Sequence, residues 1–141
     1  MIYRSVVVAL ALACSGCVDL STKPSQSPAM CNFGGQMVET QLFFGLSKPK
    51  GGVVSASEWN AFVRREVTPR FPEGFSVFDG AGFWLDGSSK RTISEKSKTI
   101  VRIHADTAQA GQAILAVIDS YKKQFAQEAV LRVDRPVCAQ F

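Results

Sequence analysis

The sequence predicts an α+β fold of the ferredoxin-like type, a split β-α-β-β-α-β chain whose four-stranded antiparallel sheet carries two helices on one face. Apolar residues alternate along four segments and recur at helical spacing along two others. These segments follow one another in the order strand, helix, strand, strand, helix, strand. With 141 residues and 46% hydrophobic residues the chain can form one such core, and we place this single domain at 31–141.

The first half of the domain is predicted to be a strand, a loop and a helix. The strand covers 38–46, where apolar residues alternate, and 48–52 is the loop. A capping box, Ser55-x-x-Glu58, begins the helix, because the serine and glutamate side chains satisfy free N–H groups of the first turn. One apolar stripe follows at helical spacing, and Pro69 ends the helix.

The middle of the domain is predicted to be a β-hairpin. Its first arm begins at 75–79 and continues into GAGFWL, where the glycines predict a bulge or a bend. Asp86-Gly87 marks the turn, although the residues after it predict a loop longer than two residues. The second arm, 92–104, alternates clearly between two faces.

A second helix and a last strand complete the order. The helix begins near Asp106 or Thr107, and its apolar residues recur at helical spacing as far as Phe125. The last strand is expected at 129–133, because Pro136 has no N–H group to donate to a sheet and limits the strand.

The N-terminus has the layout of a signal peptide, with a basic residue, a short apolar run and small residues before a cysteine. The run is far shorter than the roughly 18 to 20 apolar residues that cross a bilayer as a helix, so we predict a cleaved leader at 1–16. Its end, CSGC, resembles the lipobox of bacterial lipoproteins, in which the last cysteine is acylated. We therefore predict lipidation at Cys17. The alternative, Cys14, places the bulky Leu12 where that motif prefers a small residue.

Residues 17–30 are rich in Ser, Pro and Thr and lack periodicity, so we expect a flexible tether. A lipid at its start would hold the mature chain on a membrane of the bacterial cell envelope, outside the cytoplasm. Which membrane holds it stays open, and an ordinary leader without acylation is the alternative.

Cys31 and Cys138 flank the domain and remain as a pair after cleavage before Cys17. An extracytoplasmic compartment is oxidising, so we predict a disulfide between them. In this topology the first and fourth strands can lie at opposite sheet edges, and two buried thiols are the alternative.

Four stretches together are similar to a known family: TQLFFGLS at 40–47, VTPRFPEGFSVFDGAGFW at 67–84, EKSKTIVRI at 95–103 and YKKQFAQEAVLRVDRPVCAQF at 121–141. They resemble the DUF3574 family of small bacterial secreted or lipoprotein domains, for which no biochemical function is established. The resemblance covers nearly all of the chain after Cys31. It implies one α+β domain outside the cytoplasm and carries no catalytic residues.

The sequence holds no recognisable catalytic motif, and we predict no catalytic residue, no metal site and no cofactor. The glycines of FDGAGFW have the wrong spacing for a phosphate-binding loop. His104, the one histidine, has no evident partner to orient its ring. We expect it on the surface at a strand end, with a ligand-binding role as the alternative.

The candidate ligand site comprises Arg70, Lys98, His104, Trp84 and Glu95. Arg70 always carries its charge, so Arg70 and Lys98 together can bind an anion or a peptide terminus. The structural alternative is that these are turn, cap and ion-pair residues, with Arg70 paired to a glutamate. The glutamates considered for that pair are Glu95 and Glu128.

Two helices on one face leave the other face of the sheet open. We expect this open face to carry Phe43, Phe78, Ile100 and Val130 among the polar residues Gln41, Lys98, Arg102 and Arg132. Such a mixed surface is typical of interaction sites, so we expect a non-enzymatic binding domain that pairs with itself or with an envelope protein.

The alternative function is a small enzyme or ligand carrier working as a dimeric α/β barrel around an enclosed cavity. Nucleic acid is not expected as a partner. The net charge is +4, but acids alternate with the basic residues and no basic run forms.

Overall fold

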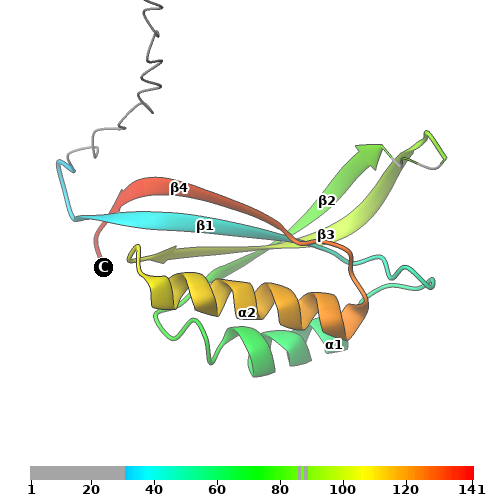
Figure 1. The fold of residues 1–141 in the computed structure, drawn as a ribbon, viewed down its shortest axis with the longest axis horizontal. Helices are drawn as coiled ribbons and strands as arrows, with labels where there is room; N and C mark the ends of the chain where they lie inside the picture. Colours follow the sequence, from blue (N-terminus) through cyan, green and yellow to red (C-terminus); the bar gives the residue numbers. More distant parts are fainter. Residues whose placement is uncertain (1–30, 86, 88) are drawn as a thin grey trace, which may run out of the picture.

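The computed structural model describes residues 31–85, 87 and 89–141, and within them two helices pack on one face of a four-stranded antiparallel sheet (Figure 1). The elements are β1 (Gly35–Gly45), α1 (Ala56–Phe62), the π-helical turn η1 (Val63–Val67), β2 (Ser76–Leu85), β3 (Thr92–His104), α2 (Ala108–Phe125) and β4 (Leu131–Ala139). The strand order is β2-β3-β1-β4. This is the ferredoxin-like arrangement, so the predicted fold class is confirmed.

The core lies between the sheet and the helices and is built around aromatic rings. The ring centroids of Phe44 in β1 and Tyr121 in α2 are 4.8 Å apart, and Phe62 at the end of α1 lies 5.1 Å from Tyr121. Both pairs meet edge to face, the arrangement that aromatic rings favour. All three side chains are fully buried, so the apolar stripes of both helices face the sheet.

The first helix begins at the predicted capping box but changes its geometry after two turns. The Thr68 N–H donates to the carbonyl of Val63, five residues earlier, at 2.9 Å, which is the spacing of a π-helix. The wider turn brings Phe62 and Val67 to the same buried side. Apolar periodicity at 3.6 residues per turn does not reveal this change.

The faces of β3 are the reverse of the prediction. Ile100 lies opposite Leu42 of β1, and Arg102 lies opposite Thr40. Directly opposed residues share a face, and all four are buried beneath the helices. Lys98 shares that face, so placing it with Ile100 and Arg102 on the open face was wrong. Alternation defines two faces of a strand but does not identify the covered one.

The open face carries Phe43, Gln41 and Phe78, as predicted, but not the residues expected from the last strand. Val130 precedes β4 and packs against the core, and Arg132 lies opposite the buried Leu42. Their neighbours Leu131 and Val133 point to the open face instead, with 60% and 42% of their surface exposed.

β4 is longer than predicted and continues through Pro136 to Ala139. β2 covers the predicted first arm of the hairpin as one strand, with the glycines that predicted a bulge or a bend inside it. β4 is an edge strand that pairs with β1 on one side, and its other side has no partner strand in the described sheet. A proline is tolerated there because an edge position does not require every N–H group.

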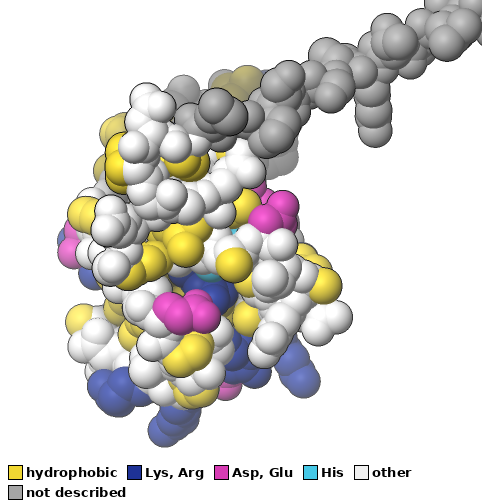
Figure 2. Space-filling model, turned by 90° about the vertical axis from the view of Figure 1, so that its left-hand side faces the viewer, with side chains coloured by type: hydrophobic (Ala, Val, Ile, Leu, Met, Phe, Trp, Pro, Cys, Tyr) yellow, Lys and Arg dark blue, Asp and Glu magenta, His cyan; other side chains and the backbone are white. Residues whose placement is uncertain are grey.

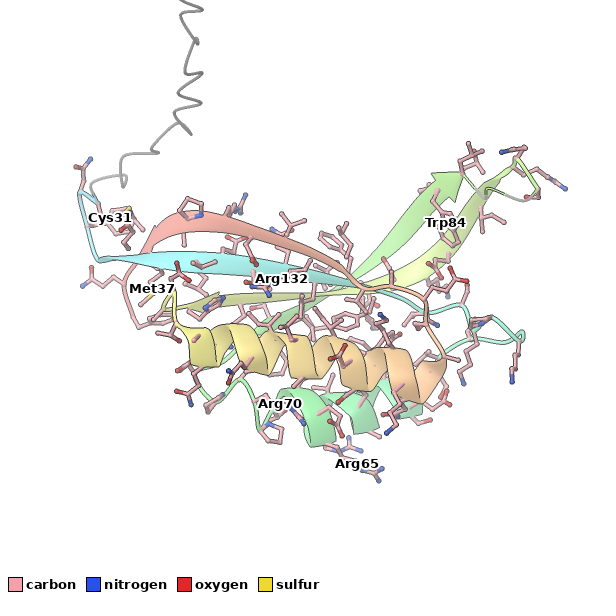
Figure 3. All side chains as sticks on the ribbon, viewed as in Figure 1. Cys31, Met37, Arg65, Arg70, Trp84 and Arg132 are labelled. Atoms are coloured by element: carbon pink, nitrogen blue, oxygen red, sulfur yellow. A yellow bond between two sulfur atoms is a disulfide. The ribbon has the colours of Figure 1, made fainter. Side chains whose placement is uncertain are left out.

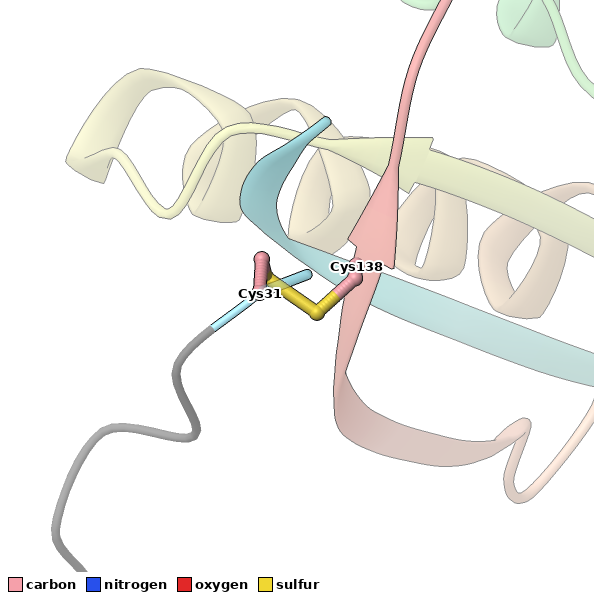
Figure 4. The surroundings of a disulfide bond; sticks show 2 residues. All are labelled: Cys31 and Cys138. Atoms are coloured by element: carbon pink, nitrogen blue, oxygen red, sulfur yellow. A yellow bond between two sulfur atoms is a disulfide. The ribbon is translucent and has the colours of Figure 1, made fainter. Parts of the chain in front are cut away.

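The predicted disulfide joins Cys31 and Cys138, whose Cα atoms are 5.5 Å apart (Figure 4). The sheet edges are β2 and β4, and β1 lies beside β4. The first and last strands are therefore neighbours and not opposite edges of the sheet, so the segments that flank them can be joined. Gly34 has a φ of +61°, and a Cβ there would lie 2.2 Å from the Ala139 carbonyl oxygen. A glycine at this position therefore lets the segment before β1 reach β4.

The predicted leader, the lipidated cysteine (Cys17 or Cys14) and the tether at 17–30 lie outside the described residues. In the parts that are described, no helix is both long and apolar enough to cross a bilayer.

Candidate functional site

The structure separates the predicted site residues. Arg70 and His104 line one cavity, and Lys98 lines a different cleft. Trp84 lies towards the end of the β2–β3 hairpin, well away from Arg70 (Figure 3). Glu95 accepts a hydrogen bond at 3.0 Å from a backbone N–H just after β1, as the structural alternative expects. The structure therefore does not bring Arg70 and Lys98 together in one cavity.

The cavity that contains Arg70 and His104 has a volume of about 140 Å³. It lies where β3 ends and α2 begins, beside the turn that follows η1. Its polar lining residues are Arg70, Glu73, Arg102, His104, Thr107 and Gln109. Figure 2 views this end of the molecule, and a histidine lies at the bottom of a hollow with basic and acidic side chains beside it.

Arg102 is the central charged group of the cavity. Its side chain is 5% exposed, and its guanidinium lies 4.5 Å from the ring centroid of Phe71. One nitrogen, Nη2, donates to Glu73 at 2.7 Å. The other two, Nε and Nη1, are buried and have no hydrogen-bond partner among the described residues. Buried charged groups are normally fully hydrogen-bonded, so this arrangement leaves Arg102 short of acceptors.

Arg70 supplies a second positive charge at the cavity. Its Nη1 donates to the carbonyl of Glu66 at 2.8 Å and to the Glu66 carboxylate at 2.9 Å. These contacts one helical turn back hold the side chain in place, about one-third exposed. The predicted pairing with Glu95 or Glu128 was wrong, because Glu66 at i−4 is the acid within reach.

The first turn of α2 closes another side of the cavity. Thr107 is the N-cap, and its hydroxyl accepts from the Ala110 N–H at 3.2 Å. Gln109 and Ala110 also line the cavity. A helix N-terminus carries partial positive charge and free N–H groups, so it favours a bound anion.

His104 is buried, and the expectation of a surface histidine was wrong. Its Nδ1 lies 2.8 Å from the Ala105 carbonyl oxygen, which can only accept. Its Nε2 lies 2.9 Å from Thr40 Oγ1, and Thr40 donates its own proton to Asp134 at 2.6 Å. Because Thr40 gives its proton to Asp134, its oxygen accepts from the Nε2–H of His104, and the three side chains form one continuous hydrogen-bonded network.

Asp134 on β4 is the negative end of this network. Burial raises the pKa of Asp134, but hydrogen bonds from Arg132 and Thr40 lower it by more. The charges of Arg132 and His104 act in the same direction, and the pKa lies below its ordinary value. Asp134 is therefore ionised at neutral pH and accepts the proton of the Thr40 hydroxyl.

The groups around the cavity are mainly donors and positive charges. Arg70, Arg102, the start of α2 and His104 surround it, and Glu73 is the acid that lines it. This arrangement can hold a small oxyanion by charge-assisted hydrogen bonds. Throughout the described ranges, no three His, Cys, Asp or Glu side chains cluster as metal ligands would.

Sequence reasoning missed Arg102, Glu73 and the Thr40–His104–Asp134 network. The signal for Arg102 was present, because alternation from the buried Ile100 places residues 102 and 104 on the same face. Two polar residues on an apolar strand face indicate a buried polar site. His104, a candidate ligand residue in the sequence, lines this cavity.

The family model described as "Protein of unknown function (DUF3574)" matches residues 39–141. No curated protein matches the sequence significantly. Among solved structures, a phage SAM lyase in complex with S-methyl-5'-thioadenosine is similar, with a TM-score of 0.57 and 15% identity over 78% of this chain and 95% of that one. The same phage enzyme in its apo state gives a TM-score of 0.50 and 18% identity over 79% and 97% of the two chains. At these identities the similarity shows a shared fold.

Proposed function

Because the chain belongs to the DUF3574 family, whose description assigns no function, we propose a function from its geometry. The protein is an extracytoplasmic binding domain, lipid-anchored in the bacterial cell envelope, that holds a small oxyanion in the cavity around Arg102. The observation that carries the proposal is the buried guanidinium whose Nε and Nη1 lack acceptors among the described residues. A carboxylate, phosphate or sulfate oxygen that entered beside the guanidinium would supply the acceptor that they need, although both nitrogens are closed to solvent in this structure.

The charge balance of the cavity supports an anionic ligand. Arg102 and Arg70 bring two positive charges, and the start of α2 adds partial positive charge. Glu73 pairs with Arg102 and Glu66 pairs with Arg70, but Glu73 is 63% exposed on a surface turn and Glu66 does not line the cavity. An anion inside the cavity would therefore meet two guanidinium groups and the start of α2, with Glu73 as the acid of the lining.

The location of the protein is part of the proposal. The lipobox-like sequence before Cys17 and the tether at 17–30 would place the domain outside the cytoplasm. The Cys31–Cys138 disulfide supports this location, because structural disulfides persist in oxidising compartments. The test is the intact mass of protein extracted from membranes. We expect a chain that begins at Cys17 with acyl mass, a Cys17→Ser variant that leaves the membrane fraction, and a Cys14→Ser variant that stays there.

Anion binding is tested by thermal unfolding with increasing phosphate, sulfate or acetate at constant ionic strength. We expect at least one of these anions to raise the Tm of the wild-type domain, because a ligand that binds the folded state stabilises it. Arg102→Met should abolish the response. Arg65→Met is the matched control, since Arg65 is an exposed arginine on η1 (Figure 3) that does not line the cavity.

An equal response of Arg102→Met and wild type would overturn the site, and so would a wild type that responds to none of the three anions. If Arg102→Met does not fold, Arg70→Gln provides the second test. It removes one of the two cavity charges at a partly exposed position and should weaken the response.

A second candidate function, pairing through the open sheet face, is favoured by the exposed apolar residues there. Phe78 and Leu131 are 56% and 60% exposed. Large apolar side chains that are exposed together are typical of interaction surfaces. Sedimentation analysis of the wild type and of Leu131→Lys tests it. We expect a concentration-dependent dimer that the substitution dissociates, and a wild-type monomer at all concentrations would exclude it.

A further inference from the structure

A second, larger cavity lies at the other end of the sheet, under the β2–β3 hairpin. Its volume is about 800 Å³, within the range of about 300 to 1,000 Å³ that is usual for small-molecule sites. It lies between the hairpin and the segment that connects β1 to α1. Figure 1 shows the hairpin bending away from the helices here, which separates the two walls.

The floor of this cleft is apolar and rigid. Leu46, Val54 and Trp59 form it, and each is less than 10% exposed and belongs to the hydrophobic core. The opposite wall is formed by the backbone of Gly80 and by Ala81 of β2, and the small side chain of Ala81 leaves the space unfilled. A rigid apolar floor facing small residues is suited to a hydrocarbon group.

The rim of the cleft is basic. Lys96 and Lys98 lie two residues apart on β3, so both point to the side of the hairpin that faces the helices. Lys98 forms an ion pair with Asp79, which also lines the cleft. Two ammonium groups and one carboxylate give the rim a net charge of +1. Among the ion pairs of the described residues, none involves Lys96, so its charge is available to a ligand.

We propose that this cleft binds a fatty acid, with the aliphatic chain on the floor of Leu46, Val54 and Trp59 and the carboxylate at Lys96. The apolar floor favours the aliphatic chain of the ligand, and the basic rim favours its carboxylate. The site is separate from the cavity around Arg102, so the proposal does not rest on the proposed function. In this proposal Lys98, which the sequence predicted as a site residue, forms the ion pair with Asp79 at the rim of the cleft.

The test uses Trp59 as its reporter. Trp59 and Trp84 are the two tryptophans of the chain, so Trp84→Phe leaves the fluorescence of Trp59 alone. In this background we expect decanoate, below its micelle concentration, to change the Trp59 emission saturably. Ala81→Leu fills the cleft and should weaken binding by at least about tenfold, which is about 1.4 kcal/mol. The exposed Ala81 tolerates this change without disturbing the core.

The charge requirement is tested separately. Lys96→Gln should weaken decanoate binding by about two- to fivefold, as expected for a partly exposed charge pair, and leave decanol binding unchanged. Lys123→Gln, an exposed position on α2, is the matched control and should have no effect. Absence of saturable binding, or equal binding to the Ala81→Leu variant, would overturn the site. Decanol binding as tightly as decanoate, with Lys96→Gln unchanged, would overturn the fatty-acid assignment.

Discussion

At the scale of single residues, Arg102 is the side chain whose environment differs most from an ordinary structural role. Its guanidinium is buried over the Phe71 ring, and its described partner is the exposed carboxylate of Glu73. Placing a charge in a low-dielectric interior is unfavourable unless every polar group is compensated. We therefore expect this residue to lower the stability of the protein in the absence of an anion.

We expect Arg102→Met to leave the free energy of unfolding unchanged, or to raise it by about 1 to 2 kcal/mol, in buffer without oxyanions. Methionine keeps the packing against Phe71, and Glu73 is exposed enough to return to water. Urea denaturation measures the effect. A loss of more than about 2 kcal/mol would show that the guanidinium is already satisfied in the native state.

Tyr121 is the opposite case, a buried polar group with its partner in place. Its hydroxyl donates to the Gly45 carbonyl at 2.8 Å, and burial, with the nearby Glu95 and Glu58 charges, raises its pKa above the ordinary value. We expect Tyr121→Phe to lower the free energy of unfolding by about 1 to 2 kcal/mol, because the carbonyl loses its donor. Thermal and urea unfolding provide the measurement. Phe43→Leu on the open face should change stability less.

At the scale of elements, the capping box before α1 links stability to pH. Hydrogen bonds from Lys48, and then from Ser55, lower the pKa of Glu58 from 4.5 to about 2. A carboxyl group with a depressed folded-state pKa stabilises the fold at pH values above 4.5, and the contribution disappears as the pH falls towards 2. The ion pair with Lys48 at 2.8 Å and the Ser55 N–H bond at 2.8 Å are the contacts involved.

We expect Glu58→Gln to be less stable than wild type at pH 6 and equal to it near pH 2, because protonation of Glu58 removes from the wild type the charge that the variant already lacks. Urea unfolding as a function of pH gives the two curves. Glu128→Gln, an exposed carboxylate after α2, serves as the control. If the difference in unfolding free energy between Glu58→Gln and wild type stayed constant down to pH 2, the lowered pKa of Glu58 would be contradicted.

The elements also show how far sequence reasoning reaches. The order of the segments, the capping box and the apolar helix stripes are local signals, and they predict the fold class correctly. The covered face of β3 depends on which side the helices occupy, which is a long-range property. Arg102 and His104 were misplaced for this reason, and the cavity that they line could not be assembled from the sequence.

Two local features were missed for different reasons. The π-helical turn at Val63–Val67 depends on the fit between helix and sheet, and apolar spacing at i+3, i+4 and i+8 is compatible with either form. The extension of β4 through Pro136 depends on β4 being an edge strand, a position that only the full strand order defines. Local propensity does not contain either piece of information.

At the scale of the whole molecule, the disulfide joins residues 107 positions apart, close to both ends of the domain. A cross-link over a loop of about 100 residues is expected to stabilise by about 4 to 5 kcal/mol through the entropy of the unfolded chain. We predict that the Cys31→Ser, Cys138→Ser double variant loses about 2 to 5 kcal/mol of unfolding free energy. Urea unfolding of the variant, compared with the reduced wild type, measures it. Unequal losses in these two forms would point to an effect of the serines themselves.

The position of this bond also determines how the domain bears mechanical load. A pull along the chain at Cys31 is divided between the start of β1 and the end of β4, because Cys138 is covalently bound to the same point. β1 lies inside the sheet with partners on both sides, and β4 pairs with it from Leu131 to Ala139. The load therefore acts on a pair of strands in parallel, and they cannot be peeled apart from that end one hydrogen bond at a time. Under a load applied at Cys31, we therefore expect this end of the sheet to resist unravelling.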